Sequence, residues 1–239
     1  MKFAYLIEPP FNYRDSDGRV TGCDVELARV VFQRLGVKEF ELVETEFANL
    51  LPGLADGRWQ MTTGLFSTIE RQQVAAFSRP IWALADGLLV RKGNPRKLTG
   101  YRSIAKDEGC ILAVIRDQLQ HRSAVKFGVP EARMRIFETY SMAADAVQSG
   151  VADAYASVGR AHTGFIERHP ELDLESIAVP ANEKAPAFGS FGFAKSDTEL
   201  RAAVDATLNA YIGSERHRAM IASFGFSDAE IDLVQGDRA

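Results

Sequence analysis

The stretch Gly64-Leu65-Phe66-Ser67-Thr68-Ile69-Glu70-Arg71 decides how the rest of the chain is interpreted. It follows a short run that reads as a strand, Trp59-Gln60-Met61-Thr62-Thr63, and it places an aromatic ring, two hydroxyls and an arginine just beyond that strand. The planar guanidinium of Arg71 can match both oxygens of a carboxylate. We therefore predict that Arg71 binds a carboxylate, and the alternative is a surface arginine in a helical turn.

The composition is that of an ordinary globular protein. The chain has 239 residues, of which 46% are hydrophobic and 25% are charged, so it can bury a sizeable core as one large domain or two small ones. The net charge is -4 and the pI is about 5.7. Nucleic acid is therefore not expected as a partner, because no basic footprint exists for it.

The sequence is compatible with either of two cellular compartments. The sequence has no apolar run near the ~18 residues of a membrane span. The segment Met1–Ile7 is too short for a signal peptide and alternates like a strand, so either the protein is cytoplasmic or an export signal has been removed. Cys23 and Cys110 suggest neither a disulfide framework nor a metal site, and both are expected to be buried thiols in different lobes. No cofactor is expected.

Strands and helices alternate along the chain, which predicts an α/β fold with parallel-rich sheets flanked by helices. The first half is expected to hold strands at residues 2–7, 40–43 and 59–63, and helices at 24–35 and 47–55. The second half repeats the order with strands at 110–115, 134–137 and 152–157, and helices at 119–127 and 141–148. Asp24 is expected to cap the first helix, and the turn at Asp15–Gly18 is expected to be a hairpin tip.

Two similar units predict two lobes joined by two crossings. Leu88–Pro95 is interpreted as the first crossing and Phe188–Lys195 as the return strand. A capping box at Ser196–Glu199 is expected to open a C-terminal helix that packs on lobe 1. The predicted limits are 1–90 with 190–239 for lobe 1 and 91–189 for lobe 2. Two crossings allow the lobes to hinge around a cleft.

The strand ends of lobe 1 predict a ligand site. Glu8 and Phe11 follow the first strand, Phe47 follows the second, and Phe66 and Arg71 follow the third. Three rings can cradle a cationic group, each worth roughly 0.5–2 kcal/mol, while Arg71 takes a carboxylate and Glu8 neutralises or hydrogen-bonds a positive nitrogen. The alternatives are that the rings belong to the core and that Glu8 is a solvated charge. Trp82 either lines the hinge side of the cleft or packs under the crossover.

Five short motifs occur in order and carry a resemblance to a known family. They are Pro9-Pro10-Phe11, Asp17–Ala28, Leu51-Pro52-Gly53-Leu54, Thr68-Ile69-Glu70-Arg71 and Phe77-Ser78-Arg79-Pro80. The chain resembles the extracellular solute-binding proteins that feed polar amino-acid-type ABC importers. The resemblance implies a two-lobed periplasmic-binding-protein fold of type II, a periplasmic location, a small zwitterionic ligand and an ABC transporter membrane permease as partner. A monomer suits a protein that must hinge.

Two positions depart from the pattern of the amino-acid binders in this family. Phe66 stands two positions after Gly64, where those proteins usually have a hydroxyl residue. Val158 stands five positions after the pair Asp153-Ala154, where they usually have the aspartate that holds the α-amino group. The resemblance therefore implies that Gly64 belongs to the site but that the ammonium-binding acid is missing.

The aromatic residues of lobe 1 resemble a particular subgroup of the family. Phe11, Phe47 and Phe66, together with Glu8 and Arg71, look like the aromatic box of the ectoine-binding proteins. The ligands of that subgroup are compatible solutes that combine a delocalised cation with a carboxylate. An ectoine-like solute is thus expected beside an ordinary amino acid.

Lobe 2 is expected to contribute through the start of a helix. Gln118 and Leu119 stand where the family has a glycine-threonine turn, and their backbone N–H groups can hold a carboxylate, with the Gln118 side chain as a further contact. Asp117 is expected to cap that helix. Ser157 and Arg160 follow the last strand of lobe 2; Ser157 is a candidate contact, whereas a surface position is preferred for Arg160.

A binding protein is the leading functional hypothesis. An enzyme similar to the cyclohexadienyl dehydratases of this fold is the second, and it would need a positioned acid or base. The third is the ligand-sensing domain of a receptor. The sequence holds no P-loop, GxGxxG, HExxH or GxSxG motif. Solvent-facing positions are expected for the histidines, His121, His162, His169 and His217.

Overall fold

The protein is described here by a computed structural model, which covers residues 1–236, and it divides into two compact units. Within the described residues, unit 1 comprises Met1–Ala83 and 187–236, and unit 2 comprises Leu84–Pro186. The lobe limits given above stay predictions, and residues 237–239 of them lie outside the described residues. In the part of the chain that is described, each helix is too short or too polar to cross a membrane.

Unit 1 is built on a sheet whose parallel strands come from the N-terminal part of the chain. β1 pairs in parallel with both β4 and β5, and β13, from the returning chain, pairs antiparallel with β5 and β6. The strands are β1 (Lys2–Tyr5), β4 (Glu41–Glu44), β5 (Met61–Phe66), β6 (Ala76–Phe77), β7 (Trp82–Leu84) and β13 (Ala187–Phe193). β7 joins the sheet by pairing with β13.

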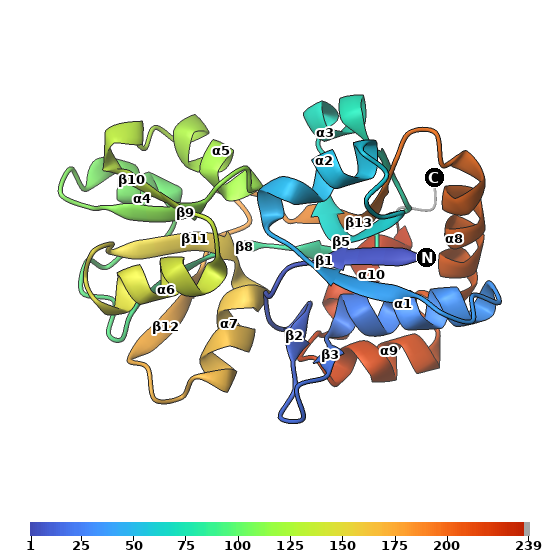
Figure 1. The fold of residues 1–239 in the computed structure, drawn as a ribbon. Coiled ribbons are helices and arrows are strands. Elements are labelled where there is room, and N and C mark those ends of the chain that lie inside the picture. Colours follow the sequence, from blue (N-terminus) through green and yellow to red (C-terminus); the bar gives the residue numbers. More distant parts are fainter. Residues whose placement is uncertain (237–239) are drawn as a thin grey trace. The chain divides into compact units, whose positions relative to one another are not determined.

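Helices cover both faces of the unit 1 sheet, with α1 on one side of β1 and α2 on the other (Figure 1). Apolar positions of α1, among them Leu27, Val31 and Phe32, are fully buried, which explains why this segment is helical and where it packs. The helices are α1 (Cys23–Arg34), the 3-10 turn η1 (Phe47–Asn49), α2 (Leu50–Ala55), α3 (Ile69–Val74), α8 (Thr198–Tyr211), α9 (Glu215–Ala222) and α10 (Asp228–Gly236). β2 (Tyr13–Arg14) and β3 (Val20–Thr21) form the predicted hairpin.

Unit 2 repeats this plan. β9 pairs in parallel with β10 and β11, and β8 pairs antiparallel with β11 and β12. The elements are α4 (Tyr101–Lys106), α5 (Leu119–Lys126), η2 (Glu131–Arg133), α6 (Tyr140–Gln148), α7 (Gly159–Arg168), β8 (Asp86–Arg91), β9 (Leu112–Ile115), β10 (Met134–Phe137), β11 (Ala154–Val158) and β12 (Leu174–Ala178). In Figure 1, α5 lies on one side of this sheet and α6 and α7 lie on the other. The predicted α/β class with parallel-rich sheets is therefore confirmed.

Three predicted helix caps are wrong. α1 begins at Cys23 after Gly22, so Asp24 lies inside the first turn and its carboxylate is used elsewhere. α8 begins at Thr198 without a side-chain cap, and the predicted capping box does not form. α5 is preceded by Gln118 at the capping position, whereas Asp117 takes a positive φ of 62° in the turn before it.

The predicted position of the first crossing along the chain is also wrong. The segment around Leu88 is the strand β8, which lies inside the unit 2 sheet between β11 and β12. The chain passes from unit 1 to unit 2 earlier, between Ala83 and Leu84. The apolar residues of β8 are buried and the strand pairs on both sides, which explains why this segment forms a strand of the sheet. Both cysteines, by contrast, are buried thiols in different units, as predicted.

The predicted solvent-facing positions are wrong for His162 and His217, which are both fully buried. His162 lies on α7, where Nε2 contacts the carbonyl oxygen of Gly87 at 3.2 Å and Nδ1 contacts the Tyr140 hydroxyl at 2.6 Å. A carbonyl can only accept, so Nε2 carries the proton and the neutral ring accepts from Tyr140. Nδ1 of His217 accepts the backbone N–H of Gly213 at 3.1 Å. These two rings are therefore internal hydrogen-bonding groups.

The burial of His162 predicts an acid-dependent loss of stability. Burial lowers the pKa of His162 from 6.5 to about 3. Below pH 6.5 His162 takes up a proton in the unfolded chain but not in the folded one, so its own contribution should lower the free energy of unfolding by up to ~1.4 kcal/mol per pH unit as the pH drops from about 6 to 4. His217, whose pKa burial lowers to about 4, adds to the slope of the wild type. Urea unfolding at pH 7, 6, 5 and 4 should show this slope.

The matching variant is His162→Phe, whose slope between pH 6 and pH 4 should be shallower by about one proton, although its stability at pH 7 is lower because Tyr140 and Gly87 lose a partner. His169→Gln is the control, because that ring is partly exposed and its Nδ1 lies 3.3 Å from the exposed carboxylate of Glu171. Equal slopes for wild type and His162→Phe would show that His162 does not titrate in this way.

Candidate functional site

Two of the three predicted rings meet on Trp82. Its ring centroid is 5.5 Å from that of Phe11 and 5.4 Å from that of Phe66, at interplanar angles of 48° and 89°. Phe11 lies in the loop after β1, and Phe66 is the last residue of β5. All three rings are largely buried in unit 1. The sequence interpretation ended the strand at Thr63, but pairing with β13 extends β5 to Phe66.

Arg71 is buried rather than exposed, with 6% of its surface accessible. Its Nη1 donates to the carbonyl oxygen of Phe66 at 3.0 Å, and its guanidinium carbon lies 5.1 Å from the centroid of the Phe47 ring. Thr68 caps α3 by accepting from the backbone N–H of Arg71 at 3.3 Å. The surface alternative for Arg71 is therefore wrong. Phe47, the partly buried first residue of η1, faces Arg71.

Glu8 and Phe11 are held in one tight turn after β1. The backbone N–H of Phe11 donates to the carbonyl oxygen of Glu8 at 2.9 Å, and the N–H of Glu8 donates to the carbonyl oxygen of Asn12 at 2.9 Å. Glu8 is mostly buried. The alternative of a fully solvated carboxylate at this strand end is therefore not what the structure shows.

A buried carboxylate that sequence reasoning misassigned connects these elements. Asp24 Oδ2 accepts the hydroxyl of Thr63 at 2.6 Å and the N–H of Gly64 at 2.7 Å, while Oδ1 accepts the indole N–H of Trp82 at 3.0 Å. Burial raises the pKa of Asp24, and these hydrogen bonds oppose that change. One signal could have revealed it: Asp24 stands four residues before Ala28 on the apolar face of α1. A charge on that face must find partners inside.

In unit 2 the predicted residues lie at the ends of two strands. Gln118 occupies the capping position of α5 with 4% of its surface accessible, and Leu119 is the first residue of that helix. The Oε1 atom of Gln118 is buried and has no hydrogen-bond partner among the described residues. Ser157 is buried in β11, opposite Gly87 of β8. Arg160 is partly buried in the first turn of α7.

Val158, which stands at the position of the missing acid, belongs to a strand pair of unit 2. Val158 lies opposite Asp86 in the pairing of β11 with β8. The carboxylate of Asp86 accepts the Tyr101 hydroxyl at 2.5 Å and the Gln120 amide at 3.0 Å, and it pairs with the Lys184 ammonium at 2.6 Å. This carboxylate is thus already neutralised by the protein's own lysine.

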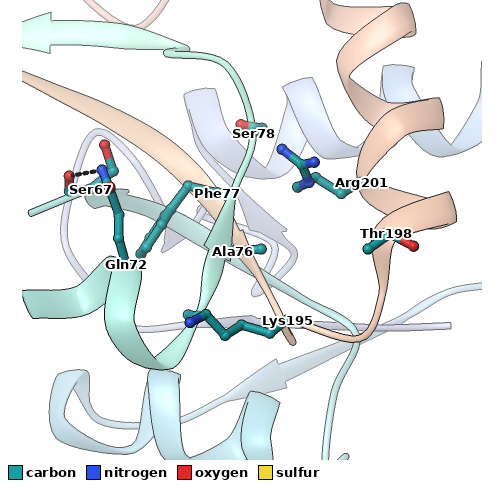
Figure 2. Close-up of a pocket in the computed structure, with 9 residues that line it drawn as sticks. Ser67, Gln72, Ala76, Phe77, Ser78, Lys195, Thr198 and Arg201 are labelled. Atoms are coloured by element: carbon teal, nitrogen blue, oxygen red, sulfur yellow. Dashed lines mark hydrogen bonds between the residues drawn. The ribbon is translucent and has the colours of Figure 1, made fainter. Parts of the chain in front are cut away.

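A pocket of about 550 Å³ lies beside α3 and is a different place from the predicted site. Figure 2 shows it between α3, β6 and the start of α8. Its cations have partners of their own, since Lys195 donates to the carbonyl oxygen of Gln73 at 2.9 Å and Arg201 lies 3.9 Å from Asp205. The residues that line it are Ser67, Gln72, Ala75, Ala76, Phe77, Ser78, Lys195, Thr198 and Arg201.

Metal ligands are not gathered in the described part of the chain. Across residues 1–236, three or more His, Cys, Asp or Glu side chains do not come together as a metal site would require. The arrangement in unit 1 instead combines a buried guanidinium with aromatic rings. Such a combination can bind a carboxylate and a cationic, partly apolar group of one small molecule.

Several known proteins resemble this chain. A probable amino-acid ABC transporter periplasmic-binding protein from Sinorhizobium fredii is 28% identical over 240 residues, which cover 97% of this chain and 78% of that protein. Cyclohexadienyl dehydratase from Pseudomonas aeruginosa is 38% identical over 79 residues, which are 33% of this chain and 28% of that enzyme. The crystal structure of EhuB in complex with hydroxyectoine matches with a TM-score of 0.89 and 28% identity, covering 98% of this chain and 90% of that chain.

The family and its fold follow from the extent of these matches. The two-unit α/β plan is that of the two-lobed type II binding proteins, so the fold prediction is confirmed. The model of the bacterial extracellular solute-binding proteins, family 3, matches residues 2–226, which is nearly the whole described chain. The chain therefore belongs to the bacterial extracellular solute-binding proteins of family 3.

Proposed function

We propose that this protein is the solute-binding component of an ABC importer and that its solute is a small zwitterion of the ectoine type. The observation that carries the proposal is the position of Arg71, which is buried, lies over the Phe47 ring and donates to the carbonyl oxygen of Phe66. The Phe66 ring in turn contacts Trp82, which also contacts Phe11. A carboxylate binds to the guanidinium, and the cationic end of the same molecule lies against the ring faces.

The unpartnered acceptor of Gln118 supports a solute that carries N–H groups. A buried amide oxygen without a donor costs about 1–3 kcal/mol, which a ligand N–H can recover. The ring nitrogens of ectoine supply such a donor, whereas the quaternary nitrogen of a betaine does not. Lys184 already pairs with the carboxylate of Asp86, which lies opposite Val158. An α-ammonium group would therefore be bound less strongly here than in proteins that have an aspartate at the position of Val158.

The partner and the location follow from the family and stay proposals for this chain. Families of this kind deliver their solute to the membrane permease of an ABC transporter, and the relative from Sinorhizobium fredii is described as a periplasmic-binding protein. We propose the same partner, a periplasmic location and a monomeric state. Sedimentation of the purified protein with and without solute would measure that state.

The enzyme alternative rests on the local similarity to cyclohexadienyl dehydratase, which covers a third of this chain. A dehydratase needs an acid or base in contact with its substrate, and Glu8 is the acid among the predicted ligand contacts of unit 1. We propose that the chain is not an enzyme. Incubation with a cyclohexadienyl carboxylate, followed by absorbance of an aromatic product, tests this directly; turnover that Glu8→Gln abolishes would favour the enzyme.

A thermal-shift screen tests the proposed solute class. Purified protein is heated with ectoine, hydroxyectoine, glycine betaine and the common amino acids, each at millimolar concentration. A ligand present at ~100 times its dissociation constant adds about 2.7 kcal/mol of stability, which such a screen resolves. We expect the largest shift with ectoines and a smaller one with glycine betaine. A shift with amino acids alone would keep the transport role and refute the ectoine-type solute.

Phe66 should contribute to affinity as a ring rather than as apolar volume. Phe66→Ala is expected to weaken ectoine binding by about 1–3 kcal/mol, measured by titration calorimetry, because a face for the cation is lost. Phe66→Leu is the matched variant, since it keeps most of the apolar volume without a π-system, and its affinity should fall nearly as far. If Phe66→Leu binds like wild type, the ring face is not used.

A further inference from the structure

The indole ring of Trp82 packs directly on the backbone of two neighbouring strands of unit 1. A Cβ atom on Gly64 of β5 would be 2.6 Å from the Trp82 ring, and one on Gly189 of β13 would be 2.0 Å from it. Any side chain at either glycine would therefore collide with the indole. Only 5% of Trp82 is accessible. The two strands thus carry glycine where the ring lies, and the sheet fixes the plane of the ring.

A hydrogen bond to Asp24 fixes the orientation of the Trp82 ring within its plane. Oδ1 of Asp24 accepts the indole N–H at 3.0 Å, while Oδ2 is held by the Thr63 hydroxyl and the Gly64 N–H. The carboxylate is therefore anchored to β5 at the same residue on which the indole lies. A hydrogen bond to a buried carboxylate is among the stronger ones in proteins, so rotation of the indole breaks a costly contact.

The same carboxylate network reaches the loop that carries Phe11. Asn12 donates from Nδ2 to the hydroxyl oxygen of Thr63 at 2.8 Å, and that hydroxyl donates to Asp24. Phe11 and Phe66 come from different elements, yet each packs on Trp82. The carbonyl oxygen of Phe11 accepts the backbone N–H of Asp24 at 3.1 Å, and Phe66 stands two residues after Gly64, whose N–H donates to the Asp24 carboxylate. The indole is thus the surface that the two rings share.

We propose that Trp82, oriented by Asp24, is a positioning residue of the solute site, because it sets the angle between the Phe11 and Phe66 rings that receive the cationic group. This rests on the proposed function. Trp82 acts through the two phenylalanines and does not itself touch the solute. The preference for a compact cation therefore depends on a carboxylate and an indole that lie behind the rings.

The first experiment compares three variants by titration calorimetry with ectoine. Trp82→Leu removes the platform and should weaken binding at least about tenfold. Trp82→Phe keeps an aromatic face and should recover part of that loss, and Asp24→Asn should weaken binding while Trp82 is retained. Trp59→Phe is the matched control, since Trp59 is also a buried tryptophan of unit 1 but donates to the carbonyl oxygen of Leu50. Its affinity should equal that of wild type.

A spectroscopic readout separates positioning from a general loss of stability. In the Trp59→Phe background Trp82 is the single tryptophan of the chain. Its emission should change when ectoine binds, because the phenylalanines in contact with it are immobilised, and Asp24→Asn should remove most of that change. Unaltered ectoine affinity in Trp82→Leu, or emission that does not respond to ectoine, would overturn the proposal while leaving solute binding intact.

If the wild type binds none of the screened solutes, the proposed solute class is refuted. The role of Trp82 is then tested without solute. Crystal structures of Trp82→Leu and Asp24→Asn are compared with that of wild type. Displaced or multiply oriented rings at Phe11 and Phe66 in both variants support positioning by Trp82. Rings that keep their wild-type orientation in either variant overturn it.

Discussion

Replacing Arg71 by alanine is expected to weaken the binding of a carboxylate solute by at least about 100-fold. The guanidinium is buried, so a solute carboxylate placed beside it would exchange water for a charge-assisted, two-pronged contact, and truncating one partner of such a pair costs about 2–5 kcal/mol. Titration calorimetry with ectoine measures the loss. Thermal unfolding of the solute-free variant should change much less, because the folded chain loses a hydrogen bond to the Phe66 carbonyl and a contact with the Phe47 ring.

Two further variants show what the loss means. Arg71→Lys keeps the charge without the planar fork, so its affinity should lie between those of wild type and Arg71→Ala. Arg14→Ala removes an exposed arginine of unit 1 that pairs with Glu44, and it should bind ectoine like wild type. Tight binding of a carboxylate solute by Arg71→Ala would exclude Arg71 from the site.

The regular part of the fold could be predicted from sequence because its signals are local. The strand at Met134–Phe137 has the predicted limits, and most helices lie within a few residues of the expected places. Periodicity cannot show which strand is the neighbour of which, so β8 was interpreted as a crossing although its apolar residues pair on both sides within unit 2. The cap at Asp24 failed for a similar reason: capping chemistry looks the same whether or not the carboxylate has partners 40 residues away.

For the candidate site, the sequence predicts residue types but not the contacts between them. Arg71 and the rings are predicted to contact a ligand because they follow strands, and the structure brings Phe11 and Phe66 together through Trp82. Trp82 could not be assigned from its sequence neighbours, since its position depends on glycines in two other strands. The buried histidines were missed because the side chains that satisfy them, such as Tyr140 for His162, are distant in sequence.

Gly189→Ala is expected to lower the free energy of unfolding by about 2–5 kcal/mol. The added Cβ would be 2.0 Å from atoms of the Trp82 ring, closer than the packed interior allows, so the indole must leave the sheet. Its N–H then loses Asp24, which leaves a buried donor and a buried carboxylate oxygen without each other. Urea unfolding at pH 7 measures the change. Gly109→Ala is the control, because a Cβ there meets the flexible Arg96 side chain at an ordinary 3.4 Å, and its effect should stay within about 0.5 kcal/mol.

The cause can be isolated with a second substitution, because the clash involves one ring. Trp82→Leu removes the atoms that the new Cβ would strike, so adding Gly189→Ala to Trp82→Leu should cost far less than adding it to wild type. The double-mutant cycle should give a coupling of about 1–3 kcal/mol between these two positions. Additive effects would mean that Gly189 is required for its own backbone conformation and that the indole is not seated on it. A large coupling would instead show that position 189 of β13 requires glycine because the Trp82 indole packs on it, so that a neighbouring strand helps to specify the ring on which Phe11 and Phe66 pack.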